Sequence, residues 1–323
     1  MELILDKWEK LLNQSEFGSF FQSPECFQFY QSLSFLNPFV IYVEDNVELK
    51  GLISGYVIEE GKGLKKRMTK RAIVYGGALL HKHITDLEFA NLIDKLKSEL
   101  IKAQVIYIEL RNYQDYSYFK TAFQQKDFNF YPYLNFHVFT PDLKSALNNL
   151  HATKRRHVTS ALRQGITCVQ STNEKDLDQF YILLKQLYRI KIKTPLYPLE
   201  FFRKVIEHGW TSFYVIKQQD QVVGGSLCVT FRGKVIYEWF VCGMDKSFKG
   251  MHPSTMATWM PIEYAATNGF DYFDMMGAGK PDTPYGVRDF KAQFGGVLVN
   301  HGRFLCVLSP FRYNIGKLVV KLL

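Results

Sequence analysis

The chain has 323 residues, which is long for one core and suits two domains of about 150 residues each. Hydrophobic residues make up 47% of it and charged residues 22%; this balance is typical of a folded globular protein and excludes extended disorder. The formal net charge is +9. Such an excess favours polyanionic partners, namely nucleic acid, nucleotide-linked substrates or anionic lipid head groups, without choosing among them.

The sequence shows no pattern typical of a secretory signal, a membrane span, a disulfide framework or a metal site. The chain begins with early acidic residues, and no stretch approaches the roughly 18 consecutive apolar residues of a membrane span. The five cysteines are scattered and lack Cys-x-x-Cys spacing, so we expect buried thiols in a reducing compartment. His81 and His83 lack a further ligand at suitable spacing, so no metal is expected. We therefore expect a cytoplasmic protein.

The first half predicts an alternation of strands and one helix. Residue patterns typical of strands occur at 39–44, 51–59, 72–75 and 105–110. A helix is predicted at about 86–102, because its leucines and isoleucine fall mainly on one side.

The middle of the chain predicts helices. They are expected at 143–164, 177–192 and 199–208, with prolines at 195 and 198 interrupting the chain before the last of them. The first of these segments carries the basic run Lys154, Arg155 and Arg156. This run could bind the phosphates of a nucleic acid, and a solvated helix surface explains it equally well.

The second half repeats the order of the first. Three strands are predicted at 213–216, 222–231 and 235–242, followed by a helix at 253–267 that ends at an Asn-Gly pair and by a strand at 272–274. We therefore predict an α/β (α+β) protein of two related domains with mixed sheets flanked by helices. The expected division is 1–145 and 146–323.

The same pentad follows the last predicted strand of each half, as FKTAF at 119–123 and FKAQF at 290–294. Counted from the preceding acidic residues Glu109 and Asp274, the second loop is longer by about six residues and contains glycines and prolines. A long loop after a strand end is where α/β folds commonly place ligands. Duplication explains the repeat, and the second half is expected to hold the working site.

Several motifs resemble the Fem family of peptidoglycan-bridge aminoacyltransferases. They are the segments 269–277 and 285–296, the sequence FQSPE at 21–25, the basic segment 154–161, and Tyr188-Arg189 followed by Phe201-Phe202. The resemblance spans nearly the whole chain, and the order of the motifs makes it specific. It implies two tandem GNAT (acyl-CoA N-acyltransferase)-like domains of the short type without a helical arm.

The resemblance also implies an activity. The chain is expected to be an enzyme that moves an aminoacyl group from aminoacyl-tRNA to an amine of a cell-wall or glycolipid precursor, without a cofactor. At 75–77 the sequence Tyr-Gly-Gly replaces the family's Arg-Gly-Pro turn, so a nucleotide-linked muropeptide acceptor is less well supported. A CoA-ester-dependent N-acyltransferase acting on a polysaccharide or lipid precursor is one alternative, although the segment 246–253 keeps only one glycine of a pyrophosphate loop. A non-catalytic binding protein with the same fold is the other.

Lys291 and Asp274 are the predicted catalytic residues. Lys291 could stabilise an oxyanion or neutralise a phosphate of the donor, with Phe290 as the aromatic wall beside it. Asp274 could orient the incoming amine or accept its proton, and a structural cap is the equal alternative. Asp282, in the long loop, is a weaker candidate for the same role.

Three further residues are predicted to bind substrate. Arg189 could contact a phosphate or carboxylate, against the alternative of a solvated helix arginine. Tyr237 and Trp239 alternate along a predicted strand, so they could line a pocket, although such residues more often belong to a core.

The last segment, 309–323, is basic and partly amphipathic. It could rest on an anionic bilayer and so place the protein peripherally at the membrane. A helix docked on its own domain is the favoured interpretation.

Overall fold

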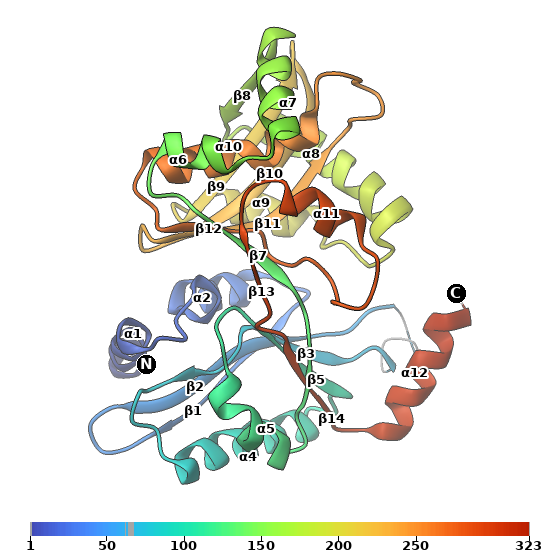
Figure 1. The fold of residues 1–323 in the computed structure, drawn as a ribbon. Coiled ribbons are helices and arrows are strands. Elements are labelled where there is room, and N and C mark those ends of the chain that lie inside the picture. Colours follow the sequence, from blue (N-terminus) through green and yellow to red (C-terminus); the bar gives the residue numbers. More distant parts are fainter. Residues whose placement is uncertain (1, 62, 64–67, 323) are drawn as a thin grey trace. The chain divides into compact units, whose positions relative to one another are not determined.

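The computed structural model describes residues 2–61, 63 and 68–322. Contacts divide the chain into two compact units (Figure 1), the first made of Met1–Tyr133 and Asn300–Leu323 and the second of Leu134–Val299. Each unit contains a seven-stranded sheet with both parallel and antiparallel neighbours. The predicted α/β class, with two mixed sheets flanked by helices, is confirmed.

The sheet of the first unit has the strand order β1-β2-β3-β5-β14-β6, with β4 paired to β2. Neighbouring strands in this sheet are antiparallel, except β3 and β5, which are parallel. These two strands pair over six residues each, from Arg71 opposite Tyr107 to Gly76 opposite Asn112. The strand bounds are β1 (Asn37–Glu44), β2 (Leu49–Ile58), β3 (Arg71–Gly76), β4 (Leu79–Leu80), β5 (Tyr107–Asn112), β6 (Asn129–Tyr131) and β14 (Arg303–Val307).

Helices cover both faces of this sheet. Figure 1 shows α4 (Asp86–Lys102) and α5 (Lys120–Gln125) on one face, and α1 (Glu2–Gln14) and α2 (Pro24–Ser32) on the other. The helix α4 begins at a capping box formed by Thr85 and Glu88, which satisfies its free N-terminal amides. Its apolar side is buried against the sheet through Phe89, Leu92, Ile93, Leu96 and Leu100. Leu87, which the sequence pattern placed on the same side in the first turn, is 72% exposed instead.

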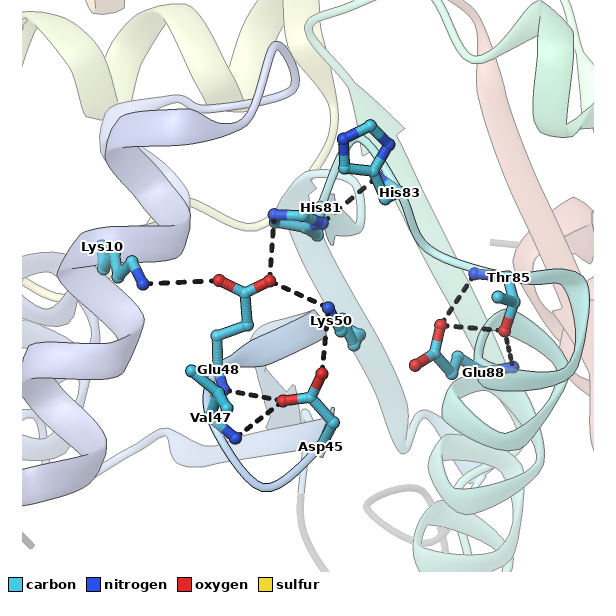
Figure 2. A network of polar contacts seen from close by, with 9 residues as sticks. All are labelled: Lys10, Asp45, Val47, Glu48, Lys50, His81, His83, Thr85 and Glu88. Atoms are coloured by element: carbon cyan, nitrogen blue, oxygen red, sulfur yellow. Dashed lines mark hydrogen bonds and ion pairs between the residues drawn. The ribbon is translucent and has the colours of Figure 1, made fainter.

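Figure 2 shows a polar network that joins α1 to the turn between β1 and β2. The Glu48 carboxylate accepts hydrogen bonds from Lys50 at 2.8 Å and Lys10 at 3.4 Å, and lies 3.4 Å from His81 Nε2. Asp45 fixes the turn by accepting from the amides of Val47 and Glu48 at 2.8 Å. His81 is therefore engaged with a structural carboxylate, and burial lowers its pKa.

The sheet of the second unit has the order β13-β7-β12-β11-β10-β9-β8, again with one parallel pair, β11 and β12. Its strands are β7 (Asn135–Phe139), β8 (Ile166–Gln170), β9 (Thr211–Gln218), β10 (Gln221–Phe231), β11 (Val235–Gly243), β12 (Tyr272–Asp274) and β13 (Val297–Val299). Its helices are α6 (Leu143–Asn149), α7 (Ala152–Arg163), α8 (Glu174–Leu187), α9 (Leu199–Ile206), α10 (Pro253–Thr267) and α11 (Gly286–Ala292).

Two details of these helices were not predicted. The expected helix at 143–164 is two helices, because the chain leaves helical geometry at Leu150 and His151. The end of α8 continues as a π-helical turn, η3 (Tyr188–Ile192), which closes at Lys193 in the left-handed conformation. The helix α10 is buried nearly all round and forms the centre of the second core.

Two strands, β7 and β14, each belong to a different unit from the strand that precedes them in the chain. β7 follows β6 closely in the chain, yet it pairs with β12 and β13 of the second unit. β14 follows β13, yet it pairs with β5 and β6 of the first unit. The observed units therefore differ from the predicted division at residue 145. The strand at 135–139 belongs to the second unit, and the segment from Asn300 belongs to the first.

The last helix, α12 (Pro310–Leu322), belongs to the first unit. Tyr313 packs edge-on against Tyr107 of β5 with ring centroids 5.3 Å apart, and Arg312 donates to the Gln104 carbonyl at 3.2 Å. The helix thus packs on the first unit, and not on the domain 146–323 with which the sequence analysis grouped it. Within the described residues, none of the helices has both the length and the apolar character needed to cross a bilayer.

Glu109 holds the exchanged strand β14 in place. Antiparallel pairing sets Arg303 directly opposite Arg111, and two like charges at that position repel each other. The Glu109 carboxylate lies between them, 2.5 Å from Arg303 Nη1 and 3.0 Å from Arg111 Nη2. Burial raises the pKa of Glu109, but the two guanidinium groups outweigh burial and lower it to about 2.

We expect Glu109→Gln to lower the free energy of unfolding by about 2 kcal/mol at neutral pH, because it leaves two partly buried guanidinium groups facing each other without an anion between them. The folded-state pKa lies below the usual 4.5. The wild type should therefore lose this stabilisation as the pH falls from about 4.5 towards 2. Urea unfolding at several pH values measures both effects. The control is Glu99→Gln, which removes an exposed pair with Lys102 and should change stability by less than about 0.5 kcal/mol. Equal effects of the two substitutions would contradict the assignment.

Candidate active site

The sheet of the second unit opens at β11. β12 pairs with β11 over only three residues, Val235 to Tyr237, and ends at Asp274, whereas β11 continues to Gly243. The matching pair in the first unit, β3 and β5, stays together over six. In the described part of the chain, no other strand takes the vacated edge of β11. Backbone groups of β11 beyond Tyr237 are therefore available to pair with an extended ligand.

A β-bulge stands at the same point. The register of β10 against β11 shifts so that Leu227 faces Phe240 and Cys228 faces Glu238. Trp239 is the extra residue, and a bulge of this kind locally redirects side chains. Glu238 is directed into the interior, where it is 3% exposed.

Lys291 reaches this point from α11. Its Nζ donates hydrogen bonds to the carbonyl of Met275 and, at 2.9 Å, to that of Gly277, and lies 3.7 Å from Glu238 Oε2. The side chain is 8% exposed. The ammonium therefore joins the loop after β12 to the bulged strand β11.

Glu238 and Lys291 form a buried pair of opposite charges. Among the described residues, neither carboxylate oxygen of Glu238 accepts a hydrogen bond of ordinary length. Burial raises the pKa of Glu238 to about 7, although the Lys291 ammonium opposes this shift. Burial also lowers the pKa of Lys291, against the attraction of Glu238 and Asp274. Such a carboxyl can exchange a proton near neutral pH.

Asp274 is fully buried and fixes the loop that follows β12. Its Oδ1 accepts from Asn135 Nδ2 and from the Met276 amide, both at 2.7 Å, and its Oδ2 lies 3.2 Å from His137 Nε2. Asn135 in turn accepts from the Gly277 amide at 2.9 Å. These bonds hold Met276 at a φ of 51° and turn the loop carbonyls towards Lys291. Asp274 therefore orients this loop, which agrees with the structural alternative given for it, and its part in handling the amine stays a prediction.

Phe290 of α11 contacts Lys154, which lies on α7. Lys154 Nζ is 3.8 Å from the Phe290 ring centroid, 5.3 Å from that of Phe294, and 3.2 Å from the Thr255 hydroxyl in the first turn of α10. Lys154 is 4% exposed, and burial lowers its pKa to about 8. A cation at this helix N-terminus adds to the positive end of the helix dipole, so the place favours an anion.

The structure separates the remaining predicted residues. Arg155 and Arg156 of the basic run are exposed, in contrast to Lys154. Tyr237 is buried, and Trp239 packs edge-on against Phe201 with ring centroids 5.0 Å apart. Arg189 lies exposed in η3 and Asp282 lies exposed in the loop before α11. Within the described residues, no hydrogen bond or ion pair joins either of these two to Lys291.

Sequence reasoning missed Glu238, Asn135 and His137. The signal for Glu238 was present, since it is the one carboxylate in an otherwise apolar and aromatic run at 235–242. The signal for Asn135 and His137 was absent, because their strand precedes the second half and pairs with β12 only in the folded chain.

The duplicated pentad has different surroundings in the two units. Lys120, the counterpart of Lys291, is exposed and lies 4.6 Å from the Phe130 ring centroid. The parallel pairing sets Ile73 opposite Glu109 and Tyr237 opposite Asp274. The next residue along the strand is therefore Val74 in the first unit and Glu238 in the second. Among the described residues, the buried pair of Glu238 and Lys291 has no counterpart at the equivalent positions Val74 and Lys120 of the first unit.

Part of the second unit is similar to a known class of domain. Residues 148–291 match the acetyltransferase (GNAT) domain family, and the match includes Glu238, Asp274 and Lys291. No match was found among curated protein sequences.

Solved structures extend the likeness to the whole chain. The structure of FemX shares the fold with a TM-score of 0.72 and 14% identity, over 96% of this chain and 98% of FemX. The C-terminal domain of a putative lysylphosphatidylglycerol synthetase from Agrobacterium fabrum has a TM-score of 0.60 and 11% identity, over 98% and 95%. A tandem GNAT protein from the clavulanic acid biosynthesis pathway has a TM-score of 0.54 and 10% identity, over 86% and 85%. The chain has a tandem GNAT fold of the Fem type, as its motifs predicted.

We expect Lys291→Met to destabilise the protein by about 3 kcal/mol, because it leaves the Glu238 carboxylate buried without a cation. Combining it with Glu238→Gln should cost clearly less than the sum of the single substitutions, with a coupling of at least about 1 kcal/mol. Urea unfolding of the four proteins gives this coupling. Lys120→Met is the matched control from the duplicated pentad, and its effect should stay within about 0.5 kcal/mol. Additive single effects would show that the pair does not interact.

Proposed function

We propose that this chain is an acyltransferase that moves an aminoacyl group from aminoacyl-tRNA to an amine of a cell-wall or glycolipid precursor. The observation that carries the proposal is the buried Glu238–Lys291 pair at the point where β11 and β12 separate. It lies within the segment that matches the acetyltransferase domain family. The aminoacyl assignment is supported by the fold shared along the full length with FemX and with a putative lysylphosphatidylglycerol synthetase.

The proposed reaction is aminolysis of an ester. The acceptor nitrogen attacks the acyl carbonyl carbon, and a proton of the amine passes to the Glu238 carboxylate. The bond between that carbon and the ribose oxygen of the tRNA breaks, and the ribose oxygen takes up the proton from Glu238, which returns that residue to the carboxylate form. Backbone groups on the open edge of β11 hold the acyl group in position. The positive charge of Lys291 lowers the cost of the negative charge that develops on the carbonyl oxygen.

The donor phosphates would meet the basic residues of α7 and the start of α10. Lys154 lies beside Thr255 at the N-terminus of α10, where a terminal phosphate is favoured. Arg155 and Arg156 are exposed on α7 and would contact the tRNA backbone further out. The pyrophosphate of a CoA ester would use the same helix terminus, so the identity of the donor has to be assayed.

We expect transfer of the amino acid from charged tRNA to an amine acceptor, and no transfer from CoA esters. Lys291→Met should reduce kcat by a factor on the order of 10², and Lys120→Met should leave it unchanged. Replacing Arg155 and Arg156 by Gln should reduce the slope of log Kd for tRNA against log salt by about 0.7 to 0.9 for each lost phosphate contact. Transfer from CoA esters alone would establish the CoA-dependent alternative. A lack of transfer from either donor would favour a binding protein.

The pH dependence tests the role of Glu238. A base must be deprotonated to accept the amine proton, so kcat/KM should rise about tenfold per pH unit and level off near pH 7, where Glu238 titrates. Glu238→Gln should remove this rise and lower the rate. Lys154 loses its charge near pH 8, which should weaken donor binding above that pH. Lys154→Arg should shift that decline upwards, because a guanidinium stays charged. An unchanged ascending limb in Glu238→Gln would exclude this base.

A further inference from the structure

An uncompensated basic segment begins in the last turns of α8. Residues 182–198 contain no Asp or Glu and four basic residues, which are Lys185, Arg189, Lys191 and Lys193. In the described residues, none of the four forms an ion pair. The nearest acidic residues along the chain are already engaged, Asp178 with Arg203 and Glu200 with Lys204, both at 3.2 Å. The segment therefore presents four positive charges to its surroundings.

Large apolar side chains lie between these charges. Ile182 is 54% exposed, Ile190 is 62% exposed and Ile192 is 43% exposed. In the run 189–193, cations and isoleucines alternate one by one. Exposed isoleucine does not stabilise a solvated basic helix surface. Surfaces that bind nucleic acid have polar or aromatic side chains between their cations. Apolar side chains among cations are typical of a surface that enters the head-group region of an anionic bilayer.

The segment is held by the fold rather than free. Phe180 and Leu184 on the opposite side of α8 are fully buried. Tyr197, just after the segment, stacks on Phe201 with ring centroids 4.5 Å apart, and Phe201 packs on Trp239 of β11. The exposed residues are thus attached through two aromatic contacts to the strand that carries Glu238.

We propose that residues 182–193, which we call the Ile–Lys surface, dock the protein on membranes that contain anionic phospholipid. The isoleucines enter the boundary between head groups and acyl chains, and the four cations contact lipid phosphates. The docking is a property of the second unit and does not depend on which acyl donor the enzyme uses. It would bring an acceptor held in a lipid layer to the site on β11.

The test is co-sedimentation of the full chain with phosphatidylcholine vesicles that contain or lack phosphatidylglycerol. Binding is expected only with phosphatidylglycerol and should weaken as salt is added. Each basic residue near an anionic surface contributes about fivefold, so Lys191→Gln with Lys193→Gln should weaken binding about 25-fold. Ile190→Ser with Ile192→Ser should weaken it by at least about tenfold, because buried apolar area is lost.

A matched control exists on α4, where Ile101 is 54% exposed and Lys102 follows it. Ile101→Ser with Lys102→Gln should leave vesicle binding unchanged. Binding of tRNA is measured on the same proteins. If the lysine variant weakens tRNA binding while the isoleucine variant changes neither ligand, the surface binds RNA and the proposal is overturned. It is also overturned if wild type does not bind the anionic vesicles. Aminoacyl transfer to a soluble amine should survive in the isoleucine variant, which separates docking from catalysis.

Discussion

The candidate site depends on β7, the strand that lies between β12 and β13 and bonds to both. Asn135 at its start holds Asp274 and the Gly277 amide, and His137 contacts the other oxygen of Asp274. Those contacts set the loop whose carbonyls bind the Lys291 ammonium. Without β7, β12 would be an edge strand and the loop would lack the bonds that turn it inward.

The same exchange completes the first unit, where β14 lies beside β5. In each unit, one inner strand comes from the segment that directly follows an edge strand of the other unit: β7 follows β6, and β14 follows β13. A strand pair needs matched backbone geometry and little specific sequence, so side chains must fix the exchange. In the first unit this is done by Glu109 between two arginines, and in the second by Asn135 and Asp274.

The two units share one kind of framework, a mixed sheet with a single parallel pair, and local electrostatics distinguish them. A buried valine at position 74 leaves nothing for Lys120 to neutralise, and that lysine remains in solvent. A buried glutamate at position 238 draws the equivalent Lys291 inwards, because a charge in the interior needs a partner of opposite sign. The early end of β12 then opens the edge of β11 next to this pair. A buried pair of opposite charges therefore lies beside an open strand edge in the second unit, and the described residues of the first unit have no counterpart at the equivalent positions.

The local elements and the internal repeat could be predicted from the amino-acid sequence. Periodicity located α4, and the Asn-Gly pair at 268–269 marked the end of α10. The pentads identified Phe290 and Lys291 as a pair in a lengthened loop. The exchange of strands between the units could not be predicted, because the sequences of strands as short as β7 and β14 do not specify which strands they pair with. Only the tertiary structure decided that Lys154 points inward while Arg155 and Arg156 stay in solvent, and that Asp274 holds a loop while Glu238 is left to titrate. Burial and hydrogen bonding set these roles, and both arise from residues far apart in the chain.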